Sequence, residues 1–280
     1  MRTVLICHAE SRIDRIGLAR WLASWSDLAG IVELRETGER KRRRFMREFE
    51  RVGAARFIDV LAFRLYYKAR LAKPDARWEQ RTLEDLATRF PDTRDRPAPR
   101  VLTTPSPNTP EAEAFIRELA PDVMVARCKT LLAQRVFSIP RVGTFVMHPG
   151  VCPEYRNAHG GFWALANDDL DKVGVTLLKI DKGVDTGPVY GYYTYPYDEV
   201  RESPLVIQQR CLFENLDAVR NTLVDIAAGV ARPIDTRGRP SGEWGQPWIT
   251  RYLRWKRQAR ARRAERATAR PTSAALPGTE

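Results

Sequence analysis

The chain has 280 residues, a length that suits one α/β domain with a small appendage, and its 43% hydrophobic content is enough for a buried core. The net charge of +12 is compatible with an anionic partner, such as nucleic acid, a membrane surface or a phosphorylated substrate, but an arginine-rich composition also arises from genomic base bias alone. No apolar run approaches the roughly 20 residues of a membrane helix, and no secretory leader is recognised, so we expect a cytoplasmic location. The four cysteines lack CxxC spacing, and no metal site is predicted.

The first part of the chain has a strand–helix–strand pattern. Thr3–Cys7 is a short apolar run that is typical of a buried parallel strand. Apolar residues at helical spacing follow over Ser11–Trp25, and Leu28–Leu34 is the second apolar run. This order predicts the start of a doubly wound, Rossmann-like sheet. Because no GxGxxG motif follows the first strand, the pattern does not indicate a dinucleotide-binding protein.

A helical insertion is predicted over residues 38–90. Its segment Arg40–Ala72 begins with the basic cluster Arg40–Arg44 and then becomes amphipathic, with aromatic and cationic side chains mixed over Phe57–Lys68. Such a segment could lie on a membrane surface or bind a partner. Charge on a helix of this kind is usually its solvated face, so we favour an insertion that packs on the sheet and shields an edge.

Two apolar runs in the middle of the chain end in polar residues that are candidates for catalysis. Gly143–Met147 reads as a strand that ends at His148, and Val173–Ile180 reads as a strand of the same kind that leads into a glycine-framed turn with Asp185. In open α/β sheets the ligand crevice lies outside the carboxyl ends of the strands. We therefore expect His148 and Asp185 to face each other there.

The last third of the chain is predicted to be mainly helical. Ser203 and Pro204 begin one long amphipathic helix that ends at Gly229, and residues from Ile249 to about Arg270 could form a basic helix. The predicted units are an α/β domain over residues 1–200, a helical extension over 201–253 and a basic tail over 254–280 that is expected to be disordered, above all from Thr268 onward.

Four motifs lie at fixed spacing between residues 121 and 190. They are Gly143 with His148 and Pro149, then Pro153 with Tyr155 and Arg156, then Gly174–Thr176, and finally Asp181–Gly187. Together they resemble the formyltransferase family that uses 10-formyltetrahydrofolate. The resemblance implies a mostly parallel Rossmann-like sheet with helices on both faces, and an enzyme that formylates an amine.

The resemblance also implies roles for particular residues. It assigns His148 to donate a hydrogen bond to the formyl oxygen, and Asp185 to orient His148 and relay a proton from the amine. The pterin edge of the folate is expected to bind backbone groups of two loops. These map to Lys129, Thr130, Leu131 and Leu132, and to Ile180, Asp181 and Gly183.

One departure from the family pattern concerns the catalytic machinery directly. The position of the family's catalytic Asn is Val146 here, and valine has no hydrogen-bond donor. Three interpretations follow. The enzyme is slow, another hydrogen-bond donor replaces the Asn, or catalysis is lost and the protein only binds its ligands. His159 is the best substitute, and Asn157 and Thr144 are the other candidates. We therefore include His159 with His148 and Asp185 among the candidate catalytic residues.

The sequence leaves several functions open. The acceptor is expected to be a small-molecule amine, with a nucleotide-linked amino sugar favoured because Tyr155–Ala164 looks more like the sugar-modifying members. A weakened or inactive relative that binds folate or a partner, and a formyltetrahydrofolate hydrolase, are alternatives. The basic clusters Arg40–Arg44 and Arg254–Arg270 leave nucleic-acid or membrane-surface binding open. A homodimer is also left open.

Overall fold

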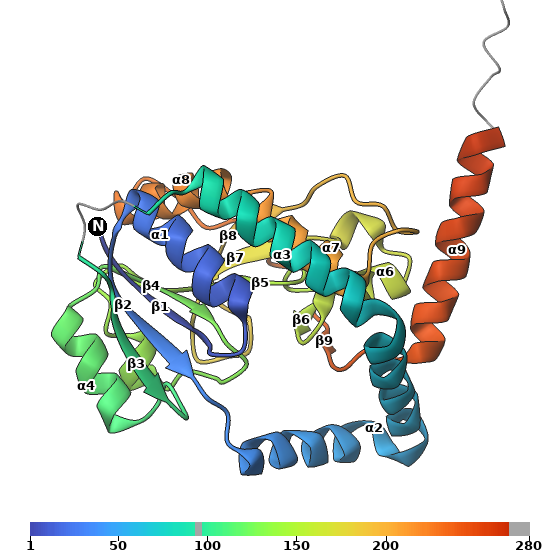
Figure 1. Cartoon of the computed structure of the whole chain (residues 1–280), viewed down its shortest axis with the longest axis horizontal. Coiled ribbons are helices and arrows are strands. Elements are labelled where there is room, and N and C mark those ends of the chain that lie inside the picture. The colour runs from blue at the N-terminus through green and yellow to red at the C-terminus, as the bar shows by residue number, and fades with distance from the viewer. Residues whose placement is uncertain (93–96, 269–280) are drawn as a thin grey trace, which may run out of the picture.

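The structure, a computed structural model, describes residues 1–92 and 97–268. Its centre is a seven-stranded sheet with the strand order β3-β2-β1-β4-β5-β7-β8 (Figure 1). The strands are β1 (Arg2–His8), β2 (Asp27–Leu34), β3 (Arg100–Thr104), β4 (Val123–Arg127), β5 (Gly143–His148), β7 (Val175–Lys179) and β8 (Val189–Tyr193). Because β3, β2, β1, β4 and β5 are mutually parallel, the prediction of a mostly parallel α/β sheet is confirmed.

Helices cover both faces of this sheet, as predicted. Alternate residues of a strand point to opposite faces, so Leu5 and Cys7 of β1 enter one core, whereas Val4 and Ile6 enter another. The larger core includes residues of η1 (Ile13–Leu18), α1 (Ala19–Trp25), α3 (Ala72–Arg89), α6 (Gly160–Ala166), α7 (Pro204–Phe213) and α8 (Leu216–Ala227). The smaller core is closed by α4 (Pro110–Leu119) and α5 (Gln134–Phe137).

The direction of β7 differs from our expectation. Strand β7 runs antiparallel to β5, with His148 paired to Thr176 and Phe145 paired to Lys179. The carboxyl end of β7 therefore lies beside the amino end of β5, so the two carboxyl ends do not share an edge. A buried apolar run looks the same in either direction, which is why its pattern did not reveal the orientation.

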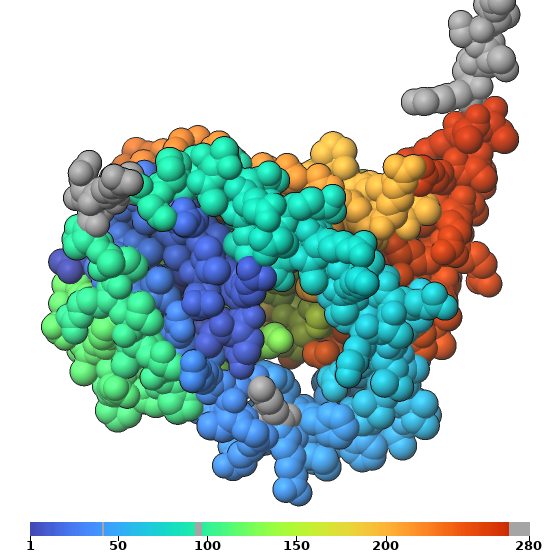
Figure 2. Space-filling view, viewed as in Figure 1, coloured from blue at the N-terminus to red at the C-terminus, as the bar shows by residue number. Residues whose placement is uncertain are grey.

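Residues 38–89 form helices that leave the sheet after β2 and return to it. They are α2 (Gly38–Tyr66), η2 (Tyr67–Leu71) and α3. Helix α2 bends sharply at Gly53, which has a φ of 75°, and Figure 1 shows its two halves at a steep angle to each other. Phe45 and Phe49 of the first half pack edge-on against Phe57 of the second. Figure 2 shows the surface hollowed between α2 and the body of the molecule.

The carboxyl-terminal part differs from the sequence prediction in two places. The single long helix is divided into α7 and α8, and between them Asn215 donates from its amide to the carbonyl oxygens of Cys211 and Thr194. Helix α9 (Ile249–Thr268) includes residues assigned to the expected disordered tail, because Trp255 and Ala259 are buried against the body. The rest of that tail, residues 269–280, lies outside the described residues.

Small elements complete the fold around the motif region. Strands β6 (Arg156–Asn157) and β9 (Glu243–Trp244) form a separate parallel pair, and η3 (Leu170–Lys172) precedes β7. The pair joins the loop at residues 149–159, here called the motif loop, to the carboxyl-terminal segment that contains β9. Within the described ranges, no helix is both long and apolar enough to cross a membrane.

Candidate active site

His148 is the last residue of β5, and both of its ring nitrogens have partners. Its side chain is 4% exposed, and Nδ1 lies 3.2 Å from Oδ2 of Asp185. Nε2 lies 2.8 Å from the carbonyl oxygen of Tyr155. A carbonyl oxygen only accepts hydrogen bonds, so Nε2 must carry a hydrogen. The other ring nitrogen, Nδ1, faces the Asp185 carboxylate, so the two side chains form a close pair.

Two glycines allow the Tyr155 carbonyl to approach His148 closely. A Cβ atom on Gly150 would lie 2.4 Å from the Tyr155 oxygen and 3.0 Å from Nε2 of His148. A Cβ atom on Gly160 would also lie 2.4 Å from that oxygen. Real Cβ atoms do not tolerate such contacts, so a side chain at either position would displace the carbonyl that holds the imidazole.

Asp185 reaches His148 because its loop doubles back from the far end of β5. The loop leaves β7 where the Ile180 N–H donates to the Thr144 carbonyl, at the amino end of β5. It returns with Asp185 at a φ of 52°, in the left-handed region that Asp tolerates better than most residues. The Asp185 carboxylate then accepts from the Asn157 N–H at 2.8 Å. The expected meeting of His148 and Asp185 occurs, but through this loop.

The loop that carries Asp185 is stiffened by its own side chains. Asp181 accepts from the Gly183 N–H at 2.9 Å and from the Thr186 hydroxyl at 2.8 Å. Gly187 passes so close to the Lys179 carbonyl that a Cβ atom there would lie 1.8 Å from the oxygen. The Asp181 carboxylate is therefore occupied within the loop, which leaves the backbone of this loop to meet a ligand.

A cavity of about 90 Å3, here called the motif cavity, brings most of the predicted cofactor-binding residues together. Its wall includes Thr130, Leu131 and Leu132 from one loop and Ile180, Asp181, Gly183 and Asp185 from the other. Lys129 does not line this cavity; its N–H donates to Nε2 of His8 at 3.1 Å. His148 lies behind Asp185 and does not line the cavity either.

Val146 lines the motif cavity on the same face of β5 as His148, two residues away. It packs on a small apolar cluster of Cys152, Leu178 and Val189. Two of the expected substitute donors are engaged elsewhere. The Thr144 hydroxyl donates to the Phe137 carbonyl, and the Asn157 amide donates to the Trp244 carbonyl.

His159 does not reach the motif cavity. It lies directly before α6, with a φ of 54°, and lines a second cavity, here called the insertion cavity. This cavity lies between α2, α6, α7 and the segment at Gln246 and Pro247. Burial, together with the nearby cations Lys129 and Arg64, lowers the pKa of His159 to about 4. The imidazole is therefore neutral at physiological pH.

Arg127, at the end of β4, was missed in the sequence. Its guanidinium donates to the Met147 carbonyl at 2.6 Å, to the Asp14 carboxylate at 3.1 Å and to Gln209 of α7 at 3.0 Å. The ion pair with Asp14 is almost wholly buried. The only sequence feature that could have pointed to Arg127 is its position as a charged residue at the end of an apolar strand. Its contact precedes His148 by one residue, so Arg127 anchors the end of β5.

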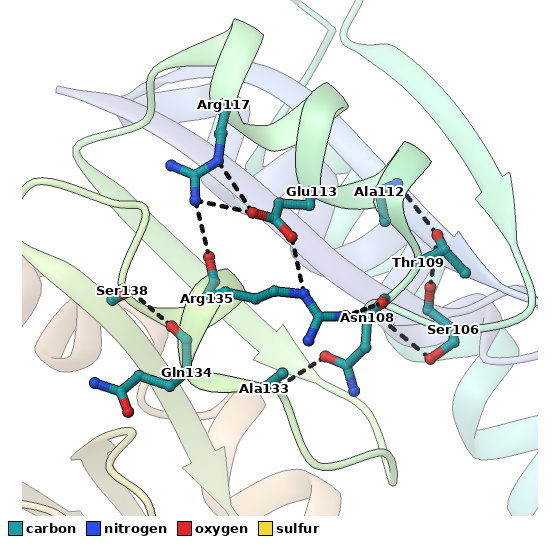
Figure 3. A network of polar contacts seen from close by, with 10 residues as sticks. All are labelled: Ser106, Asn108, Thr109, Ala112, Glu113, Arg117, Ala133, Gln134, Arg135 and Ser138. Atoms are coloured by element: carbon teal, nitrogen blue, oxygen red, sulfur yellow. Dashed lines mark hydrogen bonds and ion pairs between the residues drawn. The ribbon is translucent and has the colours of Figure 1, made fainter.

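Asn108, which also escaped the sequence analysis, supports one loop of the motif cavity. Its amide donates to the Leu131 carbonyl at 2.8 Å and accepts from the Ala133 N–H at 2.7 Å. Arg135 donates to the Asn108 carbonyl and to Glu113 of α4, as Figure 3 shows. The network ties the loop at residues 131–133 to a helix that packs on the sheet. Within residues 1–92 and 97–268, no group of three or more His, Cys, Asp or Glu could hold a metal.

Comparison with known proteins agrees with the resemblance read from the motifs. A family model described as formyl transferase matches residues 78–222. A methionyl-tRNA formyltransferase of Dehalococcoides mccartyi (strain CBDB1) is 44% identical over 82 residues, which are 29% of this chain and 26% of that protein. A methionyl-tRNA formyltransferase of Roseiflexus sp. (strain RS-1) is 32% identical over 161 residues, 53% of this chain and 49% of that protein. The chain thus spans a quarter to a half of these relatives.

The fold is also similar to that of a solved formyltransferase. A sugar N-formyltransferase from Shewanella sp FDAARGOS_354 superposes with a TM-score of 0.51 at 14% identity, covering 88% of this chain and 77% of that one. At this identity the likeness concerns the fold alone.

Proposed function

Because the chain belongs to the formyl transferase family, we propose that it transfers a formyl group from 10-formyltetrahydrofolate to an amine. The observation that carries the proposal is the pairing of His148 with Asp185, at 3.2 Å, beside a cavity lined by the two loops expected to bind folate. A carboxylate paired with an imidazole next to a donor site is what formyl transfer needs, since the attacking amine must lose a proton.

The proposed reaction uses Asp185 to move that proton. The amine nitrogen forms a bond to the formyl carbon, and the formyl oxygen takes up the electron pair as an oxyanion. The bond between the formyl carbon and the folate nitrogen then breaks, and the proton that Asp185 receives from the amine passes to that nitrogen. The role assigned to His148 requires its Nδ1–H to exchange Asp185 for the formyl oxygen, since Nε2 already donates to Tyr155.

Binding of the folate is proposed to open the motif cavity. Its volume of about 90 Å3 is smaller than the roughly 150 Å3 in which an engineered protein cavity holds benzene. A fused pterin ring is larger than benzene, so the loops at residues 129–132 and 180–185 must move apart. The exposed side chain of Leu131 leaves one of these loops room to do so.

The proposed acceptor is a small-molecule amine. An amino sugar, including a nucleotide-linked one, is the candidate that the phrase Tyr155–Ala164 favours. A solved structure with a similar fold is described as a sugar N-formyltransferase, which agrees with this candidate. The curated relatives are methionyl-tRNA formyltransferases, but the chain aligns with only part of each.

A second candidate function follows from Val146. Its side chain packs on Cys152, Leu178 and Val189 and has nothing to donate to an oxyanion, whereas one such donor contributes about 10²–10³ in rate. A protein that binds folate without efficient turnover, or that hydrolyses formyltetrahydrofolate, is therefore the alternative.

Calorimetric titration with 5-formyltetrahydrofolate, a stable stand-in for the donor, is the first test. We expect micromolar binding to the wild-type protein and to Val146→Asn. Formylation of candidate amino sugars is then compared between the two proteins. Turnover by the wild type supports the transferase. Turnover only in Val146→Asn supports the binding-only alternative, since the scaffold then lacks only the donor. No folate binding up to millimolar concentration overturns both.

A further inference from the structure

The insertion cavity is larger and more apolar than the motif cavity. Its volume is about 260 Å3, and its walls come mainly from apolar side chains of four segments. These side chains are Val60 and Phe63 of α2, Phe162 of α6, Pro204 and Leu205 of α7, and Pro247. Tyr67 adds its ring, and its hydroxyl is occupied by a hydrogen bond to Asp75. The cavity therefore offers a half-open apolar surface to a ligand.

The insertion cavity lies next to the paired residues His148 and Asp185. Gln208, part of its wall, packs on Gly161, where a Cβ atom would lie 2.7 Å from the Gln208 Cγ. The Gly161 N–H donates to the carbonyl of Pro149, the residue directly after His148.

The motif loop gives a second connection between the two cavities. The Asn157 N–H donates to Asp185, and His159, two residues later, lines the insertion cavity. Consecutive Cα atoms are 3.8 Å apart, so those of Asn157 and His159 lie within about 8 Å of each other. The wall of the insertion cavity and the backbone contact of Asp185 are therefore neighbours on the same loop.

We propose that the insertion cavity binds an apolar substituent of the amine acceptor, of about the size of a phenyl ring, and so directs the amine toward Asp185. This inference rests on the proposed formyl transfer, and it favours an amine with an apolar substituent over the amino-sugar candidate. The volume exceeds the roughly 150 Å3 in which a cavity holds benzene, and it lies just below the range of whole-ligand pockets. The cavity thus suits part of a ligand, with the reacting group left outside it.

The charges around the opening favour an uncharged amine. Arg64 lines the cavity, and Arg64 and Lys129 each lower the pKa of His159 more than the Glu48 carboxylate raises it. The same cations disfavour a bound ammonium ion, so they favour the neutral amine that attacks the formyl carbon. His159, neutral at physiological pH, can exchange a hydrogen bond with the substrate without adding charge.

The walls of this cavity belong to segments outside the motifs. Helix α2 is held against the carboxyl-terminal segment by two carboxylates: Glu48 accepts from the Gln246 N–H at 3.2 Å, and Asp59 accepts from the Thr250 N–H at 3.0 Å. We therefore expect the insertion and the carboxyl-terminal segment to determine which amine acceptor binds.

The test compares two amines that differ in the group beside the nitrogen. Wild-type protein is titrated calorimetrically with benzylamine and with glucosamine at a pH high enough that both amines are largely uncharged. Leu205→Trp fills the cavity from its rim, where Leu205 is 36% exposed, and Val224→Trp is a matched control on α8, where Val224 is 46% exposed. We expect benzylamine to bind at least about tenfold more tightly than glucosamine, and Leu205→Trp alone to remove that preference.

Equal binding of the two amines by the wild type, or tighter binding of glucosamine, overturns the inference without need of any variant. A benzylamine preference that persists in a folded Leu205→Trp protein overturns it as well. Titration with 5-formyltetrahydrofolate on the same samples separates the two proposals. Folate binding without a benzylamine preference rejects only the cavity assignment, and a benzylamine preference without folate binding rejects only the formyl donor.

Discussion

The two cavities of this protein are built from different kinds of sequence. The motif cavity is lined by strand ends and by the tight loops at residues 128–132 and 180–185, and it contains the carboxylates of Asp181 and Asp185. The insertion cavity is lined mainly by aromatic and aliphatic side chains of α2, α6 and α7. The shape of the motif cavity depends on backbone geometry, and the shape of the insertion cavity depends on side-chain size. We infer that the motif region is adapted to the formyl donor and that the insertion is adapted to the acceptor.

The strongest test of this division is Asp185→Asn. An amide cannot take up the amine proton, so we expect formyl transfer to fall by about 10²–10⁴-fold. Benzylamine binding should change much less, because its phenyl group is proposed to occupy the insertion cavity, whose wall does not include Asp185. Asp217→Asn, which alters an exposed ion pair with Arg89, is the control and should leave turnover unchanged. Turnover of Asp185→Asn within a few-fold of wild type would remove Asp185 from the mechanism.

Arg127→Met tests the link between the two regions. Arg127 joins Asp14, the end of β5 and Gln209 of α7, so its loss leaves a buried carboxylate unpaired. We expect the free energy of unfolding in urea to fall by about 3–5 kcal/mol. Arg100→Met, which breaks an exposed pair with Glu118, should cost less than about 1 kcal/mol. Equal losses of unfolding free energy in the two variants would mean that the buried ion pair stabilises the fold no more than the exposed one.

His159→Gln tests the boundary between the cavities through pH. The folded protein holds the pKa of His159 at about 4, below its unfolded value of 6.5. As pH falls from 6.5 toward 4, the unfolded chain therefore binds a proton that the folded protein does not, and stability declines. Gln does not titrate, so the variant should lose about 1–3 kcal/mol less over this range. Identical pH slopes in urea unfolding would show that His159 is readily protonated in the folded state.

Asn108→Ala tests the motif cavity alone and should have the smallest effect. The change removes two hydrogen bonds to the loop at residues 131–133 without touching the proposed ligand. Each such bond is worth about 1 kcal/mol, so we expect binding of 5-formyltetrahydrofolate to weaken about 3–10-fold and benzylamine binding to stay constant. Asn221→Ala on α8 is the control. A matching loss of benzylamine affinity would show that the cavities are not independent.

Much of the fold could be predicted because buried parallel strands are continuous apolar runs. Thr3–Cys7, Leu28–Leu34 and Gly143–Met147 lie within β1, β2 and β5. The direction of β7 could not be predicted in this way, since the run Val175–Lys179 is equally apolar in both orientations. The break between α7 and α8 was also hidden, because the apolar stripe continues through Asn215, whose amide bonds to Cys211 and Thr194.

The sequence by itself determined the family, the chemical groups in the motifs and the absence of an amide at position 146. Their roles in catalysis stay predictions. Tertiary structure alone decided that the Asp185 loop folds back from the far end of β5, and that the Tyr155 carbonyl takes one nitrogen of His148. It also separated His159 from the motif cavity. These outcomes depend on backbone atoms and on helices distant in the chain, and local residue patterns do not encode such contacts.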